Sequence, residues 1–280
     1  MSGPISGVES LYLNFKPSIT SPKIIIPSQQ RPYEWDDQVI DDFFTDLTEA
    51  FLQHIQKYPT ENPYDYFYIG SLIFCANKKE RFVIDGQQRM VTFHLASLAI
   101  DRLVTEETVK GDKSTWKKDL RYFKGTMQKF ARAFGKDQAG FKIGFQTKDD
   151  GDDWEKFRNS IIDIDVANED VKHKRKDSKI TKKYKIVKRR IEEMFTRIFQ
   201  EAHKKCGSYG EGSTGSQQAE IQAYEAVDRI LSDFIENQIV ITPIVTDDFS
   251  ESFKLFENFN AKRTPLSGDS LIKNLILMVA

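Results

Sequence analysis

The feature that most constrains this chain is a strand that passes through a glycine into a helix. Residues 81–84 are largely apolar and predict a strand, and a helical pattern starts at Met90. Between them stands the pentapeptide Asp-Gly-Gln-Gln-Arg at 85–89. The first backbone N–H groups of such a helix face the turn, and the helix dipole adds partial positive charge there. The junction therefore predicts a site for an anion such as phosphate.

The side chains of this turn also suit phosphate chemistry. Gly86 allows a close backbone approach, and Gln87 and Gln88 can each donate and accept hydrogen bonds. Arg89 offers a planar fork that matches phosphate oxygens. Asp85 would repel a phosphate unless a metal ion or a proton lay between them, so we interpret it as a ligand for magnesium or as the group that orients an attacking water. An ordinary turn, with Asp85 as helix cap and Arg89 in solvent, is the alternative.

A second cluster upstream repeats the order of a strand followed by Gln-Arg. Residues 24–27 (Ile-Ile-Ile-Pro) predict a short edge strand, and Gln30 and Arg31 follow it. Tyr33 and Trp35 then supply flat faces on which a base or a guanidinium can stack. For Trp35, packing that anchors the next helix to the core is the alternative interpretation. For Gln30 and Arg31 the pattern favours a functional role.

Four blocks of sequence, in order, resemble the N-terminal family of GmrSD-type restriction endonucleases. They lie at 26–35, 68–72, 85–89 and 256–274, so the resemblance covers most of the chain. It implies a fold related to ParB and sulfiredoxin, in which the turn at 85–89 binds and helps to hydrolyse a nucleoside triphosphate with magnesium. In such proteins the nucleotide module controls modification-dependent, type IV-like restriction of phage DNA. The chain departs from the family pattern at 29, at 262–263 and at 269–270, where an aromatic residue, a glycine and an aspartate are usual.

The predicted site combines the residue chemistry with this resemblance. Catalytic roles are expected for Asp85, Gln87, Gln88 and Arg89, with Asp85 as the metal ligand. Asn260 and Lys273 near the end of the chain would complete the pocket, although Lys273 is equally explained as an ordinary helix charge. The full set of expected nucleotide contacts is Gln30, Arg31, Tyr33, Trp35, Gly86, Asn260 and Lys273.

The net charge of −1 does not indicate a nucleic-acid-binding protein, but the charges are segregated. Residues 36–49 are acidic, and residues 172–190 are rich in lysine and arginine. Apolar residues recur at steps of four and three from Ile180 to Ile198, which predicts a helix with one buried face and outward basic side chains. These side chains could contact a DNA backbone, and a solvated face that balances the acidic helix is the alternative. The candidate DNA contacts are Lys182, Lys183, Lys185, Lys188 and Arg189.

We predict an α+β chain with a small mixed β-sheet of ParB/sulfiredoxin-like type and a large, mainly helical remainder. The expected divisions are a nucleotide-binding domain at 20–108, a helical domain at 109–236 and a returning segment at 237–280. Near its start, the largely apolar residues 238–246 predict a strand that joins the N-terminal sheet. If it does, the region 260–274 lies near the turn at 85–89.

Composition places the chain among globular proteins, since 280 residues with 39% hydrophobic content suffice for one large or two modest domains. Two cysteines in different segments, no long apolar stretch and no signal sequence predict a cytoplasmic protein without a membrane partner. The four histidines lie far apart, so they do not predict the histidine-metal nuclease of full-length relatives, and His94 is expected to be a packed or half-exposed core histidine. We expect the nuclease in a separate subunit or outside this sequence, and a homo-oligomer is a further option.

Two classes of function remain open. The first is a magnesium-dependent nucleoside triphosphatase that controls a restriction or anti-phage system. The second is a non-catalytic, ParB-like clamp that uses nucleotide to change shape or to hold DNA. Both require the two arginine-bearing bends, at Arg31 and Arg89, to converge on one anionic pocket.

Overall fold

The computed structural model of the chain describes residues 8–15, 22–27, 30, 33–57, 66–77, 79–110, 123–137, 140–141, 143–145, 179–210 and 217–260. Its strands are β1 (Glu9–Ser10), β2 (Lys23–Ile26), β3 (Phe67–Ala76), β4 (Glu80–Asp85), β5 (Lys136–Asp137), β6 (Gly140–Phe141), β7 (Ile143–Phe145) and β8 (Ile239–Thr246). Its helices are α1 (Leu11–Phe15), α2 (Asp37–Lys57), α3 (Gln87–Lys110), α5 (Lys124–Ala133), α7 (Lys179–Gly210), α8 (Gln217–Asp233), the π-helical turn η1 (Phe234–Gln238) and α9 (Phe249–Asn260).

Six strands form one mixed sheet in the order β1-β8-β3-β4-β2-β7, and β5 pairs with β6 in a separate ribbon. β3 runs antiparallel to β4 and parallel to β8, while β2 runs parallel to both β4 and β7. The α+β class with a mixed sheet is therefore confirmed. The strand predicted at 238–246 lies beside β3, which confirms that the C-terminal segment returns to the N-terminal sheet.

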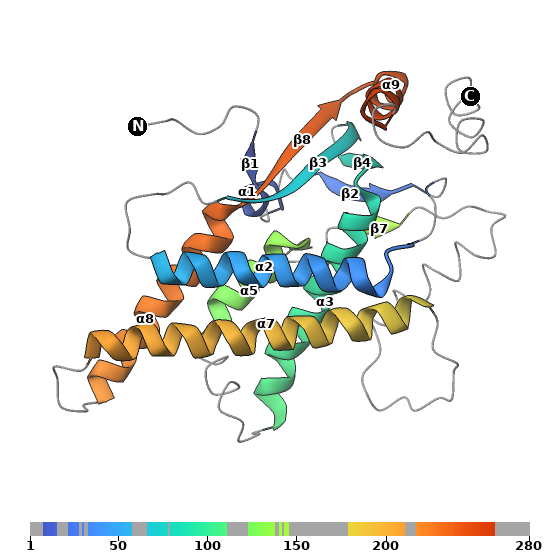
Figure 1. Cartoon of the computed structure of the whole chain (residues 1–280). Helices are drawn as coiled ribbons and strands as arrows, with labels where there is room; N and C mark the ends of the chain where they lie inside the picture. The colour runs from blue at the N-terminus through green and yellow to red at the C-terminus, as the bar shows by residue number, and fades with distance from the viewer. Residues whose placement is uncertain are drawn as a thin grey trace, which may run out of the picture.

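Most helices lie on one side of this sheet, as Figure 1 shows for α2, α3, α5 and α7. The inward side chains of β3 and β4, such as Leu72 and Val83, join phenylalanines from these helices in one hydrophobic core. Along α7 the predicted apolar stripe is confirmed, because Ile180, Tyr184, Val187, Ile191, Met194 and Ile198 are all buried. Because this core joins residues from all three predicted segments, the structure does not separate them, and the domain boundaries stay a prediction.

The opposite side of the sheet carries α9 (Figure 1). Phe253 of α9 packs on a small second cluster that contains Ile73, Cys75 and Ile84. On the same face, the side chain of Tyr68 is 53% exposed. Among the described residues, no helix is both long and apolar enough to cross a membrane.

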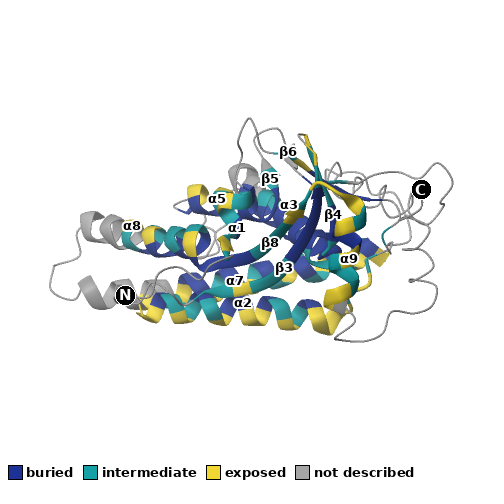
Figure 2. Cartoon of the chain, turned by 90° about the horizontal axis from the view of Figure 1, so that it is seen from above, coloured by how far each residue is buried: buried dark blue, intermediate teal, exposed yellow. Residues whose placement is uncertain are grey.

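Helix α3 runs through the centre of the molecule, and its residues 90–100 are all buried. Among them is His94, which confirms that it is a core histidine and shows that it is packed rather than half-exposed. Burial lowers the pKa of His94 to about 4, so the imidazole is neutral at neutral pH. By contrast, α2 has buried residues along one side and exposed residues along the other (Figure 2). This is the pattern of a helix that covers a core from outside.

Candidate functional site

The strand, glycine and helix predicted around residue 86 are present. β4 ends at Asp85, α3 begins at Gln87, and the first hydrogen bond of the helix runs from Met90 N–H to the Gly86 carbonyl oxygen at 2.9 Å. Gly86 has φ +91°, a conformation that residues with a Cβ rarely adopt. A Cβ added there would also lie 2.3 Å from Cδ2 of Leu72. Both observations explain why this turn requires glycine.

The guanidinium of Arg89 lies over a bulge in β3. The register between β3 and β8 shifts between Tyr68 and Gly70, so Ile69 is an extra residue in the strand. Arg89 Nη1 donates a hydrogen bond of 3.4 Å to the carbonyl oxygen of Ile69. Gly70 has φ +121°, and a Cβ added to it would lie 2.2 Å from the same nitrogen. The bulge and its glycine therefore make room for the guanidinium, and they bring the blocks at 68–72 and 85–89 together.

Asp85 stands next to this guanidinium. Its Oδ2 lies 3.8 Å from Arg89 Nη2, and the two side chains are 34% and 22% exposed. A partly exposed pair of this kind contributes at most about 1 kcal/mol to stability. Its importance is chemical, because a guanidinium that can bind an anion and a carboxylate are held side by side at the N-terminus of a helix, and both are partly exposed to solvent.

Gln30 connects the first sequence block to β4. The register between β3 and β4 shifts at Ile73/Phe74 and leaves Ile84 as an extra residue in β4. The Nε2 of Gln30 donates to the carbonyl oxygens of Val83 and Ile84, at 3.2 and 3.1 Å. Backbone pairing between β2 and β4 ends at Ile25 and Phe82, and the Pro27 that follows β2 has no N–H to donate. The side-chain amide thus replaces backbone donors beside a bulge.

Gln88 makes the reverse connection, from α3 to the segment before α2. Its Oε1 accepts hydrogen bonds from the backbone N–H groups of Glu34 and Trp35, at 2.7 and 3.2 Å. Nearby, the hydroxyls of Tyr33 and Thr92 are 2.8 Å apart, and Thr92 also donates to the Gln88 carbonyl oxygen at 3.0 Å. Burial raises the pKa of Tyr33, an effect opposed by the bond to Thr92. Residues 33–35 are therefore held against the first turns of α3.

The remaining predicted nucleotide contacts are only partly described. Gln87 is buried, and Trp35 packs against the core with its ring centroid 5.9 Å from that of Phe43. Arg31 and Lys273 lie outside the described residues, and so does the side chain of Asn260, the last residue of α9. The convergence of Arg31 with Arg89 therefore stays a prediction.

Sequence reasoning missed Gly70 as part of this site. A signal was present, because a glycine inside a strand pattern often marks a bulge or a close approach by another group. The partner in that approach, Arg89, lies 19 positions further along the chain and could not be identified from local pattern.

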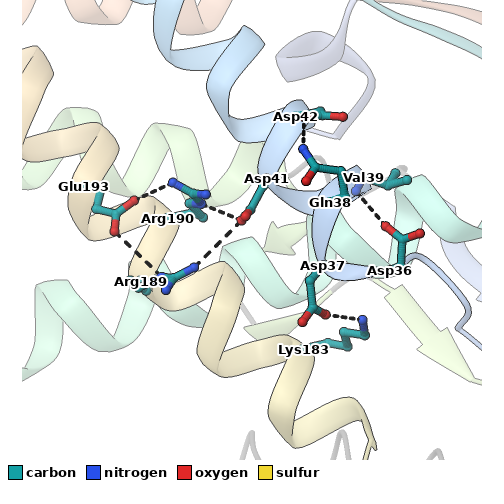
Figure 3. Close-up of polar contacts among 10 residues, drawn as sticks. All are labelled: Asp36, Asp37, Gln38, Val39, Asp41, Asp42, Lys183, Arg189, Arg190 and Glu193. Atoms are coloured by element: carbon teal, nitrogen blue, oxygen red, sulfur yellow. Dashed lines mark hydrogen bonds and ion pairs between the residues drawn. The ribbon is translucent and has the colours of Figure 1, made fainter.

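The basic helix α7 runs parallel to the acidic helix α2, and ion pairs connect them (Figure 3). Lys183 pairs with Asp37, and Arg190 Nε lies 2.5 Å from Asp41 Oδ1. The bond from Arg190 lowers the pKa of Asp41, and Asp41 in turn raises the pKa of Arg190. Further along, Arg197 and Glu49 make a 2.7 Å contact.

These pairs bear on the candidate DNA contacts. Lys183 is engaged with α2, and Arg189 lies 3.9 Å from Asp41 while its side chain stays 58% exposed. Lys182 and Lys185 are exposed, and Lys188 is half-buried. The pairing of Lys183 is what a basic helix that balances an acidic one would show, and DNA contact by all five residues stays a prediction.

Within the described residues, no group of three or more His, Cys, Asp or Glu side chains is arranged to hold a metal ion. Asp85 still fits magnesium that arrives with a nucleotide, because such an ion takes one or two carboxylates and fills its other positions with phosphate oxygens and water. A metal cage built wholly from protein is not what this donor set offers.

Comparison with known proteins adds a family to this geometry. No curated protein matches the chain. A family model described as the GmrSD restriction endonuclease, N-terminal domain, matches residues 13–277. The matched span contains β2, the bulged strand β3, the turn at 85–89 and α9. The chain therefore belongs to the N-terminal domain family of GmrSD restriction endonucleases.

Proposed function

We propose that the turn between β4 and α3 binds and hydrolyses a nucleoside triphosphate, and that this reaction controls DNA cleavage in a restriction system. One observation carries the proposal. The guanidinium of Arg89 is held over Gly70, at the start of a helix, with the carboxylate of Asp85 3.8 Å away. Family membership supplies the restriction context.

The arrangement suits a phosphate group for three reasons. A guanidinium presents parallel N–H donors at the spacing of phosphate oxygens. The first turn of α3 adds oriented backbone N–H groups and the positive end of the helix dipole. Gly86 adopts the φ of +91° that turns the chain from β4 into this helix. The proposed role of Arg89 is to bind and orient the phosphates, and that of Gly86 is to form the turn that presents the backbone N–H groups to them.

Asp85 is proposed to act in hydrolysis. Its carboxylate would hold magnesium or orient the attacking water, whose oxygen forms a bond to the terminal phosphorus as the bond to the diphosphate breaks. Bound magnesium supplies charge neutralisation on the phosphate oxygens. Asp85 suits either task because its side chain is partly exposed beside the phosphate-binding guanidinium.

The proposal extends to partners. Arg31, Asn260 and Lys273 are proposed as further nucleotide contacts from segments whose side chains the structure does not describe. The exposed basic side chains of α7, Lys182 and Lys185 among them, would contact the phosphate backbone of DNA without reading its sequence. The proposed DNA is modified phage DNA, and the proposed partner for cleavage is a nuclease domain or subunit.

The test is phosphate release from ATP, GTP, CTP and UTP with magnesium, measured together with nucleotide affinity. Arg89→Lys keeps the charge and loses the fork, so affinity should fall by roughly tenfold or more. Asp85→Asn should retain binding and lose turnover. Lys124→Ala, which removes an exposed cation from α5, is the control and should behave as wild type.

The two function classes give different results in this assay. Tight nucleotide binding without turnover in the wild-type chain would favour the ParB-like clamp over the hydrolase. Absence of binding to all four nucleotides would contradict both.

A further inference from the structure

Two glutamines join the sequence blocks around the turn, and they use opposite ends of the same chemical group. Gln30 donates through its amide nitrogen, whereas Gln88 accepts through its amide oxygen. These orientations follow from the partners. Backbone carbonyls can only accept, so they face the nitrogen of Gln30, and backbone N–H groups can only donate, so they face the oxygen of Gln88.

The contacts of Gln30 leave its donors occupied. A glutamine amide has two N–H donors, both on Nε2, and here two carbonyl oxygens lie within hydrogen-bond distance of that nitrogen. A phosphate offers only acceptors and would have to compete with Val83 and Ile84 for these hydrogens. Losing the hydrogen bonds from Gln30 would take this donor away from the two carbonyl oxygens beside the bulge, at a cost in stability. The side chain therefore fits a bond that fixes the end of β4, immediately before Asp85.

The contacts of Gln88 fix a second segment. Its oxygen receives two backbone N–H groups from residues 34–35, just before α2 begins at Asp37. The start of α2 is itself capped by Asp36, whose carboxylate accepts from Val39 N–H at 2.8 Å. Gln88 thus sets where α2 starts relative to the turn at 85–89. Because α2 is ion-paired along α7, the position of this end of α2 also bears on the basic helix.

We propose that Gln30 and Gln88 are positioning residues, which lock β4, α2 and α3 around the turn through hydrogen bonds to backbone, and that neither binds phosphate directly. Their effect on nucleotide rests on the proposed function, but the bonds themselves do not. Gln30 acts through Asp85 and Gly86, which follow the carbonyls it holds. Gln88 acts by holding residues 33–35 against α3.

Glutamate and methionine substitutions distinguish the role of the amide nitrogen as a donor from that of the amide oxygen as an acceptor. Gln88→Glu keeps an oxygen that accepts the same two N–H groups, whereas Gln88→Met has the same length and no acceptor. Gln30→Glu loses both donors and places a carboxylate against two carbonyl oxygens, whereas Gln30→Met only loses the donors. We expect opposite orders of stability: Glu above Met at position 88, and Glu below Met at position 30. A side chain that acts by packing alone would give the same order at both positions.

Hydrogen exchange and nucleotide affinity complete the experiment, with full-length variants at pH 7.5. Gln88→Met should speed amide exchange at residues 34 and 35 and weaken nucleotide binding by about tenfold, the effect of losing roughly one net hydrogen bond to the site's framework. Gln88→Glu should restore both. A phosphate ligand would behave differently, because a carboxylate there would repel phosphate and weaken binding more than methionine does.

The outcomes separate this inference from the proposed function. Loss of affinity in Gln88→Glu with unchanged exchange at residues 34 and 35 would overturn the positioning role. If the wild-type chain binds no nucleotide, the proposed function fails, and exchange and the two stability orders still decide the positioning role. Should Gln88→Met not fold, the comparison of wild type with Gln88→Glu is sufficient, because retained exchange protection supports the proposal and lost protection contradicts it.

Discussion

Gly70→Ala tests whether the bulge in β3 exists to admit the Arg89 guanidinium. The added Cβ would lie 2.2 Å from Arg89 Nη1, and the residue would have to keep φ +121°. The backbone conformation alone costs about 1–3 kcal/mol for a residue with a side chain. The steric part is relieved cheaply by the flexible arginine, so its cost appears as displacement of the guanidinium. Charge-assisted hydrogen bonds lost in this way correspond to roughly 10- to 150-fold in nucleotide affinity.

The assay combines urea unfolding with nucleotide titration. Gly125→Ala is the matched control, because nothing lies within 4 Å of the added Cβ and the residue is in helix α5. It should leave binding unchanged and stabilise the chain by up to about 1 kcal/mol. A Gly70→Ala variant with wild-type unfolding midpoint and wild-type affinity would refute the reasoning. A variant that loses stability but keeps affinity would show that the guanidinium position does not matter for binding.

Three further predictions concern stability. Gly86→Ala should lower the urea midpoint more than Gly70→Ala, because its Cβ meets the buried side chain of Leu72 rather than a flexible arginine, and equal midpoints would contradict this. Arg190→Met should destabilise the chain at pH 7, because Arg190 lowers the pKa of Asp41. The stability that this pair provides is present above 3.8, the pKa of Asp41 in the unfolded chain, and is lost as pH falls through the lower pKa of the folded chain. The urea midpoints of wild type and Arg190→Met should therefore converge in acid, and a constant difference would contradict this. Burial lowers the pKa of His94 from 6.5 to about 4, so between these values the unfolded chain takes up a proton and the folded chain does not. The free energy of unfolding should therefore fall as pH is lowered from 6.5 toward 4. A His94→Phe variant with the same pH dependence of stability would show that another group is responsible.

Local features of the fold could be predicted from sequence. The turn at 85–89 was identifiable because a strand pattern, a glycine and a helix pattern follow one another within a few residues. The buried stripe of α7 was identifiable because helical periodicity is independent of what the helix packs against. The strand at Ile239–Thr246 could be assigned from its β-branched residues, and its return to the N-terminal sheet was expected, but its neighbour β3 was not predicted.

The contacts that build the site could not be predicted in the same way. Register shifts in β3 and β4 arise from pairing between distant strands, and they decide that Gly70 faces Arg89 and that Gln30 faces two carbonyls. Glutamine both donates and accepts, so its type alone does not show which end is used or whether the partner is phosphate or backbone. The pairing of Lys183 with Asp37 could not be predicted either. The sequence places the lysine on an outward face of its helix but does not show that this helix lies beside α2.

The central claim is that a nucleotide phosphate binds at Arg89, at the start of α3. A crystal structure with a non-hydrolysable nucleoside triphosphate and magnesium tests it most directly. The account predicts phosphate oxygens within hydrogen-bond distance of the guanidiniums of both Arg89 and Arg31, with Asp85 at the metal or at a water next to the terminal phosphate. A nucleotide bound elsewhere on the chain, with no phosphate oxygen within hydrogen-bond distance of Arg89, would contradict it.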